Sequence, residues 1–302
     1  MSDSSIRRFP SPLRYPGGKG KIINYIKLLF LENDLVGTTY VEPYAGGASV
    51  ALALLYEEYA DRIHINDLNR SVHAFWEACL TNTEALCRRI HDTPVTMEEW
   101  KRQRDVQTAE DPDPLDLAFS TFFLNRTNRS GIIGAGVIGG NSQDGEWKLD
   151  ARYNKTALIR RIEKVARYRN RITLTRLDAV DLLRDLAAQP SRALFFYLDP
   201  PYYVKGARLY QNFYRHDDHV LVADLVRSLP HPWLVSYDAA PEILELYQGY
   251  PRIMYKLAYS ATNRYAGAEV MFFSRGLNPP SVPSPVGVRA EYVDRIRRQL
   301  VS

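Results

Sequence analysis

The sequence predicts an α/β fold in which helices cover both faces of a sheet and one mostly helical segment is inserted. Residues 38–67 give the order strand, glycine-rich turn, helix, strand and acidic residue, which is typical of a nucleotide-binding βαβ unit. This alternation is lost between residues 70 and 155 and returns after residue 155. The apolar run 193–198 is too short and too aromatic for a helix and indicates a fully buried strand.

Hydrophobic spacing places the individual elements along this frame. Apolar residues at helical spacing predict a first helix over residues 22–31, and Asp217 or Asp218 is the expected N-cap of a late helix. We expect the other helices over residues 49–59, 72–89, 115–125, 155–168, 180–188 and 217–229. We expect strands over residues 38–42, 62–66, 172–176, 193–198, 233–237, 252–257 and 269–274.

The domain organisation follows from where the alternation stops. We expect one α/β domain built from residues 1–69 and 156–275, interrupted by an inserted subdomain over 70–155. The insert ends in a glycine-rich stretch, 131–140, which indicates an adaptable loop or hairpin. Residues 276–302 form a proline-rich tail with a short basic helix.

Composition and charge restrict the class of protein. The chain has 302 residues, of which 45% are hydrophobic and 25% charged, as in a globular protein with a sizeable core. No apolar run approaches the roughly 20 residues that cross a bilayer, and the N-terminus lacks a signal-peptide pattern, so we expect a cytoplasmic protein without a membrane partner. Between residues 152 and 176 there are nine basic residues and one acidic residue. This run fits either a solvated helix face or, as we favour, a polyanionic partner.

The tetrapeptide Asp199-Pro200-Pro201-Tyr202 directly follows the buried strand 193–198. The two prolines cannot donate ladder hydrogen bonds, and they stiffen the backbone where the strand leaves the sheet. A carboxylate, a carbonyl-rich corner and an aromatic ring therefore meet at the carboxyl end of a strand, where open α/β sheets bind ligands. Taken alone, the same residues are also compatible with a turn that closes a core strand.

A loop near the N-terminus is the second candidate for ligand binding. In residues 12–21 the glycines, including Gly18, allow a ligand to approach the backbone, Lys19 can neutralise a carboxylate, and Tyr15 offers an aromatic wall. A phosphate-binding loop is the rival interpretation. The segment lacks the spacing of a Walker loop and the Ser or Thr after its lysine, which argues against a nucleotide triphosphatase.

Three further strand ends carry candidate binding groups. Glu42, Pro43, Tyr44 and Gly46 lie in the first strand-to-helix turn. Asp67 ends the second strand, where an acid can accept hydrogen bonds from ribose hydroxyls or cap a helix. Asp178 ends another strand, where it can meet an adenine edge or, as readily, cap the helix that follows.

These motifs together resemble the Dam-like class of S-adenosylmethionine-dependent DNA adenine-N6 methyltransferases. The resemblance runs from about Leu13 to Phe273 and depends on the order Pro16-Gly17-Gly18-Lys19, Glu42-Pro43 and Asp199-Pro200-Pro201-Tyr202. Segment 122–127 and the residues after Tyr202 also resemble the family. The resemblance implies a Rossmann-like methyltransferase sheet. One departure is visible, because related turns often read Gly-x-Gly where this chain has Gly46-Gly47-Ala48.

The resemblance implies roles for individual residues and S-adenosyl-L-methionine as cofactor. The catalytic residues are expected to be Asp199, Pro200 and Tyr202. The cofactor is expected to contact Tyr15, Gly18, Lys19, Glu42, Pro43, Tyr44, Gly46, Asp67, Asp178 and Asp199. Asp199 and the Pro200 carbonyl would accept hydrogen bonds from the adenine amine, and Tyr202 would stack on a base rotated out of the duplex.

Double-stranded DNA is the expected partner. Arginine pairs with guanine edges and asparagine with adenine edges, so the insert residues Asn125, Arg126, Asn128 and Arg129 are the candidates for sequence recognition. Lys155 and Arg160 of the basic run are expected to hold phosphates. Tyr203 is expected to border the DNA channel.

Two alternatives to DNA adenine methylation are open to the sequence. One is an amino-methyltransferase that acts on cytosine N4 or on RNA, and the other is a catalytically silent DNA-binding protein of the same fold. Direct methyl transfer requires neither a metal nor a covalent enzyme intermediate, so we expect no metal site. A separate restriction endonuclease is a further expected partner, and the sequence gives no oligomeric state.

Overall fold

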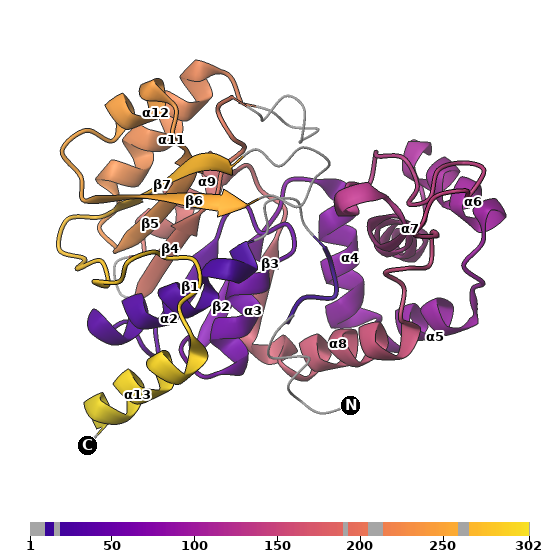
Figure 1. Ribbon diagram of the computed structural model, residues 1–302, viewed down its shortest axis with the longest axis horizontal. Coiled ribbons are helices and arrows are strands. Elements are labelled where there is room, and N and C mark those ends of the chain that lie inside the picture. The colour runs from indigo at the N-terminus through magenta and orange to yellow at the C-terminus, as the bar shows by residue number, and fades with distance from the viewer. Residues whose placement is uncertain (1–9, 15–18, 190–192, 205–213, 259–265, 302) are drawn as a thin grey trace. The chain divides into compact units, whose positions relative to one another are not determined.

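The computed structural model describes residues 10–14, 19–189, 193–204, 214–258 and 266–301. The chain forms two compact units, and Figure 1 colours their elements by residue number from the N-terminus to the C-terminus. The first comprises Met1–Gly18 and Asp67–Arg176, and the second comprises Lys19–Asn66 and Leu177–Ser302. Each unit has its own buried core, as expected for a domain.

The second unit is built on a mixed sheet. Its strands are β1 (Thr39–Glu42), β2 (Arg62–Asn66), β4 (Leu194–Leu198), β5 (Trp233–Asp238), β6 (Arg252–Ala258) and β7 (Ala266–Phe273). Their order across the sheet is β2-β1-β4-β5-β7-β6. The strands β2, β1, β4 and β5 are parallel, whereas β7 is antiparallel to both of its neighbours. The predicted α/β fold is confirmed.

Side chains alternate between two buried faces of this sheet, because successive residues of a strand point to opposite sides. On one face the rings of Tyr40 and Phe195 stack with centroids 6.2 Å apart, and Phe30 of α2 (Ile23–Glu32) meets Phe195 edge-on at 5.0 Å. The opposite face packs Val41, Phe196 and other apolar residues against helices. These helices are α9 (Ala179–Ala187), α11 (His216–Ser228) and α12 (Pro241–Leu246). Burial on both faces explains why β4 is entirely apolar.

The carboxyl ends of the parallel strands bring acidic residues to one edge of the sheet. Glu42 is the last residue of β1, Asp199 follows β4, and Asp238 is the last residue of β5. Because β7 runs in the opposite direction, its early residue Glu269 pairs with Asp238 at the end of β5. A strand near the C-terminus therefore adds a fourth carboxylate to this edge. The unit is completed by η1 (Lys19–Ile22), α3 (Ser49–Tyr56) and α13 (Ala290–Val301).

The first unit is mostly helical. Its elements are α4 (Arg70–Thr81), α5 (Thr83–Asp92), α6 (Met97–Thr108), α7 (Pro114–Thr127), η2 (Arg129–Gly131), α8 (Lys155–Arg167), η3 (Arg169–Arg171) and β3 (Ile172–Thr175). Every residue of α7 from Leu117 to Thr127 is buried, including its polar ones. Phe122 stacks on Phe75 with centroids 6.0 Å apart and meets Tyr153 edge-on at 5.4 Å. A helix buried all round must satisfy its polar side chains inside the protein.

Three details of the predicted elements were wrong or missing. The expected helix 72–89 is two helices, because the backbone leaves helical geometry at Asn82 (φ −124°, ψ 35°). Helix α11 is capped by Arg215, and the carboxylate of Asp218 accepts a hydrogen bond from the Arg215 N–H at 2.8 Å, so neither Asp217 nor Asp218 is the N-cap. Helices α6 and α12 were not predicted.

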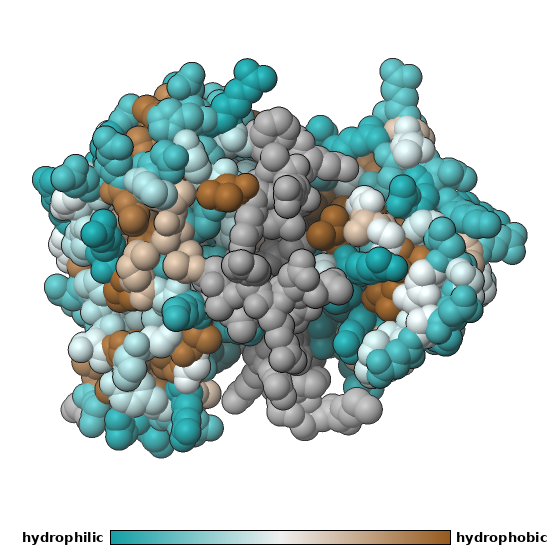
Figure 2. Space-filling model, turned by 45° about the horizontal axis from the view of Figure 1, so that its top comes forward, coloured by the Kyte–Doolittle hydropathy of each residue, from teal (hydrophilic) through white to brown (hydrophobic). Residues whose placement is uncertain are grey.

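In the part of the chain that the structure describes, no helix is both long enough and apolar enough to cross a bilayer. On the face drawn in Figure 2, hydrophilic side chains predominate and hydrophobic ones form small, separate groups.

Candidate active site

The Asp199 carboxylate is anchored through one of its two oxygens, Oδ1. Its Oδ1 accepts a hydrogen bond from the Ser236 hydroxyl at 2.8 Å and lies 3.0 Å from Nζ of Lys19. The Ser236 hydroxyl lies 3.0 Å from the hydroxyl of Tyr197, which belongs to β4, the strand directly before Asp199. The Asp199 side chain is 21% exposed. With both anchors on Oδ1, the second oxygen, Oδ2, is the one available to a ligand.

Lys19 is buried among acceptors, and its side chain is 5% exposed. Besides Asp199, its ammonium lies 2.9 Å from the Tyr202 hydroxyl and 3.3 Å from Oε2 of Glu269. Burial alone lowers the pKa of a lysine. The negative charge of Asp199, together with contributions from tyrosines that include Tyr202, outweighs the effect of burial, and the pKa of Lys19 lies well above its usual value. Lys19 is therefore a permanent cation in this site.

The pKa of Asp199 is raised, first by burial and also by the nearby charge of Glu269. The Lys19 ammonium and the Ser236 hydrogen bond lower the same pKa and offset part of the rise. The result is a carboxylate that is more basic than an exposed aspartate. Such a group is suited to accept a hydrogen bond from an amine and to take up a proton from it.

Tyr202 is 3% exposed, and its hydroxyl is part of the same network. The hydroxyl accepts a hydrogen bond from Lys19 and donates one to Oε2 of Glu269 at 3.1 Å. The Lys19 ammonium lies 5.1 Å from the centroid of the Tyr202 ring, within the range of a cation–π contact. Stacking of the Tyr202 ring on a flipped base stays a prediction. Pro200, which lies between Asp199 and Tyr202 in the sequence, is also buried.

The segment after the tetrapeptide is fixed by Asp238. Its two carboxylate oxygens accept hydrogen bonds from the backbone N–H groups of Tyr203 and Val204, each at 2.9 Å. The Tyr203 side chain is half-buried, and its hydroxyl lies 3.1 Å from Nδ1 of His216. Asp238 thus fixes the backbone where the chain leaves the Asp-Pro-Pro-Tyr segment.

The turn after β1 has the geometry of a close backbone approach. Gly46 and Ala48 both have positive φ angles, of 46° and 47°, and Ala48 is the N-cap of α3. The left-handed conformation strains an alanine by about 1 kcal/mol, which explains why glycine is common at this position in related turns. Glu42 is 5% exposed, and Pro43 is held by a hydrogen bond of 2.9 Å from the Asn66 amide to its carbonyl.

Other residues expected at the cofactor lie as follows. The hydroxyl of Tyr44 is 3.0 Å from that of Tyr214. Asp67 follows β2, and its Oδ1 accepts the backbone N–H of Asn69 at 2.9 Å. Asp178 caps α9 through the Val180 N–H at 2.8 Å, which is the structural alternative foreseen for it. Tyr15 and Gly18 lie outside the described residues.

Three insert residues expected at base edges are buried within α7 and at its end. The Asn125 amide accepts the Arg14 N–H at 2.8 Å and donates to the carbonyls of Arg14 and Gly131 at 2.6 and 2.8 Å. The Asn128 amide accepts from Trp100 and donates to backbone carbonyls, and Arg126 donates to the Pro12 carbonyl through Nε at 2.9 Å. This burial argues against base recognition by the three side chains, because their polar groups already bind the protein.

Arg129 and Arg160 are exposed, as contact with DNA would require. Lys155 is half-buried, and its ammonium donates to the carbonyls of His91 and Thr93 at 2.6 and 2.7 Å. It therefore joins the start of α8 to the end of α5 as well as adding positive charge. DNA contacts by all three residues stay predictions.

Ser236, Asp238 and Glu269 belong to this network, and sequence reasoning did not single them out. Ser236 lies in the segment 233–237 that was predicted as a strand, and Asp238, which directly follows that segment, carried the same signal as Asp199. Glu269 was expected only as the first residue of a strand. The antiparallel direction of β7, which brings it to this edge, has no local signal in the sequence.

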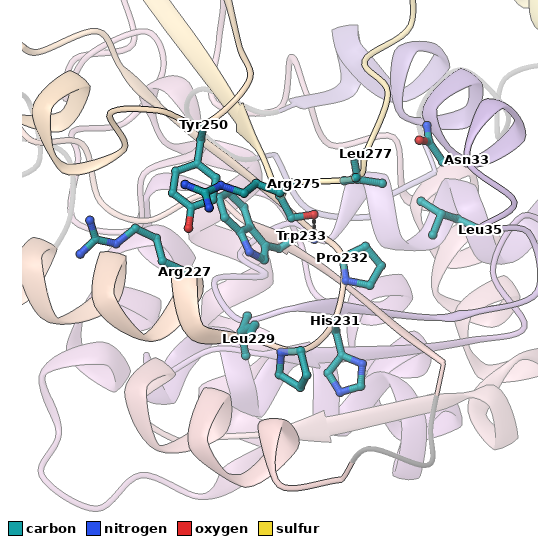
Figure 3. A pocket seen from close by; sticks show the side chains of 13 residues that line it. Asn33, Leu35, Arg227, Leu229, His231, Pro232, Trp233, Tyr250, Arg275 and Leu277 are labelled. Atoms are coloured by element: carbon teal, nitrogen blue, oxygen red, sulfur yellow. Dashed lines mark hydrogen bonds between the residues drawn. The ribbon is translucent and has the colours of Figure 1, made fainter.

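A cavity of about 500 Å³ lies at the opposite end of β5. Trp233, the first residue of the strand, lines it together with Tyr250, His231 and two arginines, Arg227 and Arg275 (Figure 3). Trp233 and Asp238 are five residues apart in an extended strand, which separates them by about 17 Å. This cavity is therefore not the hollow in which Asp199 would meet a substrate.

A glycine-containing turn, acidic strand ends and an anchored Asp-Pro-Pro-Tyr segment thus lie at the carboxyl ends of the parallel strands. Residues 15–262 match the family described as D12 class N6 adenine-specific DNA methyltransferases. The chain belongs to this family, which confirms the resemblance noted from the motifs, and the family implies S-adenosylmethionine as cofactor.

Individual relatives are more distant. The chain is 29% identical over 133 residues to the modification methylase StsI of Streptococcus sanguinis, a match that covers 40% of this chain and 19% of the relative. The chain thus spans about a fifth of that protein. Among solved structures, the rRNA methyltransferase aviRa of Streptomyces viridochromogenes is 12% identical with a TM-score of 0.41, covering 92% of this chain and 94% of its own. A SAM-dependent methyltransferase of Agrobacterium tumefaciens is 9% identical with a TM-score of 0.39, covering 83% and 60%.

Proposed function

We propose that this protein transfers a methyl group from S-adenosylmethionine to N6 of an adenine in duplex DNA. The observation that carries the proposal is Asp199, anchored through Oδ1 at the carboxyl end of β4 in a chain of the D12 class. An amino-methyltransferase for cytosine N4 or RNA is less consistent with the adenine-specific family. A catalytically silent protein is less consistent with an intact Lys19–Asp199 pair.

The residues present fit the cofactor. The turn with positive φ at Gly46 allows a ligand to approach the backbone, and a buried Glu42 and an acid at Asp67 can accept hydrogen bonds from a nucleoside. We assign cofactor contacts to these residues and to Tyr15, Gly18, Lys19, Pro43 and Tyr44, and we give Asp178 a place beside the adenine ring. When bound, S-adenosylmethionine supplies a sulfonium methyl group and leaves as a neutral thioether, while the amine releases one proton.

The chain's own residues prepare the nucleophile. The lone pair of the adenine amine is delocalised into the ring, so the amine must be drawn towards tetrahedral geometry. Oδ2 of Asp199 and the Pro200 carbonyl accept its two N–H groups, and the carboxylate stabilises the positive charge that develops on nitrogen. Asp199, with its raised pKa, then receives the released proton.

The base must leave the duplex to reach Asp199, which costs a few kcal/mol. Stacking on the Tyr202 ring contributes about 1–3 kcal/mol towards this by analogy with other base–aromatic contacts. We assign phosphate contacts to Arg160 and Lys155, a sequence contact to Arg129, and the border of the DNA channel to Tyr203. We leave Asn125, Arg126 and Asn128 out of the proposed base contacts, because their side chains are buried.

The test is incorporation of label. Wild-type protein is incubated with tritiated S-adenosylmethionine and unmethylated plasmid DNA, and the nucleosides are separated after digestion. Tritium in N6-methyladenine is the expected result, and label in cytosine or in added RNA would contradict it. An Asp199→Ala protein should bind DNA with wild-type affinity and incorporate at least 1,000-fold less label, a loss within the range of general acid–base and electrostatic catalysis.

A DNA substrate places the enzyme in the cytoplasm, and a separately acting restriction endonuclease of the same site specificity is its proposed companion. Sequencing of methylated adenines in cells that express the protein would give that specificity. Cleavage of unmethylated, but not methylated, DNA by a co-expressed nuclease would support the companion.

A further inference from the structure

Glu269 is a buried carboxylate that the proposed reaction does not use. Its side chain is 1% exposed, and one of its oxygens, Oε2, lies 3.3 Å from the Lys19 ammonium and 3.1 Å from the Tyr202 hydroxyl. Removing an ionised carboxylate from water costs several kcal/mol unless strong partners compensate. A buried glutamate in this position therefore calls for a role beyond packing.

The backbone around Glu269 is fixed on both sides. In the sheet, Glu269 pairs with Asp238 of β5 and with Tyr255 of β6. Asp238 in turn holds the backbone of Tyr203 and Val204, which follow the tetrapeptide. Glu269 thus enters the site from a rigid strand, as a group that holds others in place should.

We infer that Glu269 is a positioning residue for methyl transfer, which holds the Lys19 ammonium against Oδ1 of Asp199 and fixes the Tyr202 hydroxyl beside it. The inference rests on the proposed function. Glu269 touches two groups that flank the substrate and does not itself reach the reacting atoms. Through Lys19, it determines which oxygen of Asp199 is anchored and which faces the amine.

Because of Glu269, the Lys19 ammonium forms ion pairs with two carboxylates, those of Asp199 and Glu269. Its charge raises the pKa of Asp199, whereas Lys19 and Ser236 lower it. In the described part of the chain, Asp199 interacts with Lys19 of η1, Tyr40 of β1, Tyr197 of β4, Ser236 and Tyr237 of β5 and Glu269 of β7. The Lys19 ammonium interacts in addition with Tyr202 and with Tyr255 of β6. Glu269 and Lys19 therefore act on the basicity of Asp199 in opposite directions.

The experiment compares Glu269→Gln, Glu269→Asp and Lys19→Met with Glu245→Gln, an exposed control on α12. We expect Glu269→Gln to lower kcat at least 10-fold while KM for DNA changes less than threefold. Glu245→Gln should match wild type. Glu269→Asp keeps the charge but shortens the side chain, so it should lower kcat and leave the pH profile unchanged.

The pH profile separates positioning from general loss of stability. Removing the Glu269 charge lowers the pKa of Asp199, so the acid limb of kcat should move to lower pH in Glu269→Gln. Removing the Lys19 charge raises that pKa, so the limb should move to higher pH in Lys19→Met. When Glu269→Gln is added to Lys19→Met, kcat should fall less than threefold below that of Lys19→Met alone. If Glu269→Gln lowers kcat as strongly in Lys19→Met as it does in the wild-type protein, the inference is overturned.

A measurement without catalysis keeps the inference separate from the proposed function. In protein with ¹⁵N-labelled lysine, the buried Lys19 ammonium should give a slowly exchanging resonance that Glu269→Gln abolishes and Glu245→Gln retains. Absence of adenine methylation by wild-type protein would refute the proposed function and leave this result intact. An unchanged Lys19 resonance, or an unchanged kcat in Glu269→Gln, would overturn the role of Glu269. Should Glu269→Gln not fold, wild-type kcat in Glu269→Asp would overturn it equally.

Discussion

The hydroxyl of Ser236 in β5 donates a 2.8 Å hydrogen bond to Oδ1 of Asp199, which follows β4 and lies 37 positions earlier in the chain. β4 and β5 are adjacent and parallel, so their carboxyl ends meet at the same edge. Ser236 is fully buried and is itself held by Tyr197. The orientation of the Asp199 carboxylate is therefore set by the neighbouring strand.

Replacing Ser236 by alanine should impair catalysis and shift its pH dependence. A hydrogen bond to a charged group contributes about 1.5–3 kcal/mol, so kcat should fall roughly 10- to 100-fold. The Ser236 hydroxyl stabilises the ionised form of Asp199, so its loss raises the pKa of Asp199. The acid limb of kcat should therefore move to higher pH. Steady-state rates of label incorporation between pH 5 and 9 measure both effects, with the exposed Ser228→Ala as control. A limb that moves to lower pH would contradict this account.

The sequence was sufficient to locate Asp199 but not its partners. A polar residue directly after a buried apolar run marks a strand end, and all strands of the parallel part were placed to within two residues. The contacts of Asp199 depend instead on strand order and direction. Only the antiparallel insertion of β7 beside β5 brings Glu269 to this edge, and pairings over such distances along the chain have no local pattern.

Three of the insert residues proposed to read bases are buried. Asparagine and arginine at the end of α7 have the chemistry that reads bases, and a polar residue is normally exposed. In the structure α7 packs against α4, α5 and α6, and its polar side chains donate to the backbone carbonyls of Pro12 and Arg14. This burial results from the packing of four helices, so the sequence of α7 alone does not predict it.

Replacing Asp238 by alanine should loosen the chain after the catalytic corner. Two backbone N–H groups, of Tyr203 and Val204, would lose a charged acceptor. We expect the free energy of unfolding to fall by about 2 kcal/mol and kcat to fall at least 10-fold. Urea denaturation and label incorporation measure the two effects, with the exposed Asp185→Ala as control. Unchanged kcat with reduced stability would show that the geometry of Asp199 and Tyr202 does not depend on the hydrogen bonds of Asp238.

Replacing Asn125 by alanine should destabilise the first unit. The amide makes three hydrogen bonds to the backbone of Arg14 and Gly131, and its side chain is buried. With about 1 kcal/mol for each bond, the free energy of unfolding should fall by about 3 kcal/mol. The exposed Asn141→Ala serves as control in the same unit. Equal stability of both variants, together with an altered recognition sequence for Asn125→Ala, would restore the original assignment to base recognition.

Burial makes Arg126 a second test of the same region. Its pKa is lowered to about 9 by burial and by the nearby Arg161 and Arg14, so it is protonated at pH 7. A buried cation that donates to the Pro12 carbonyl cannot be removed without leaving that carbonyl unpaired. Arg126→Ala should therefore lower the free energy of unfolding by about 2 kcal/mol and leave sequence preference unchanged in the folded fraction. Denaturation curves and methylation of matched and mismatched duplexes decide between the two roles.

The exposed Arg129 and Arg160 should separate sequence recognition from phosphate binding. Each phosphate contact contributes about one unit to the slope of log K against log salt concentration, so Arg160→Ala should reduce that slope by roughly one and weaken binding to all sequences alike. An arginine that binds a guanine edge contributes about 1–3 kcal/mol of discrimination. Arg129→Ala should therefore reduce the preference for the matched over the mismatched duplex by about 5- to 100-fold.

Binding titrations at several salt concentrations measure the salt dependence of binding and the preference for the matched duplex. Equal losses on every sequence for Arg129→Ala would reassign it to the phosphates and leave recognition of the target to other residues.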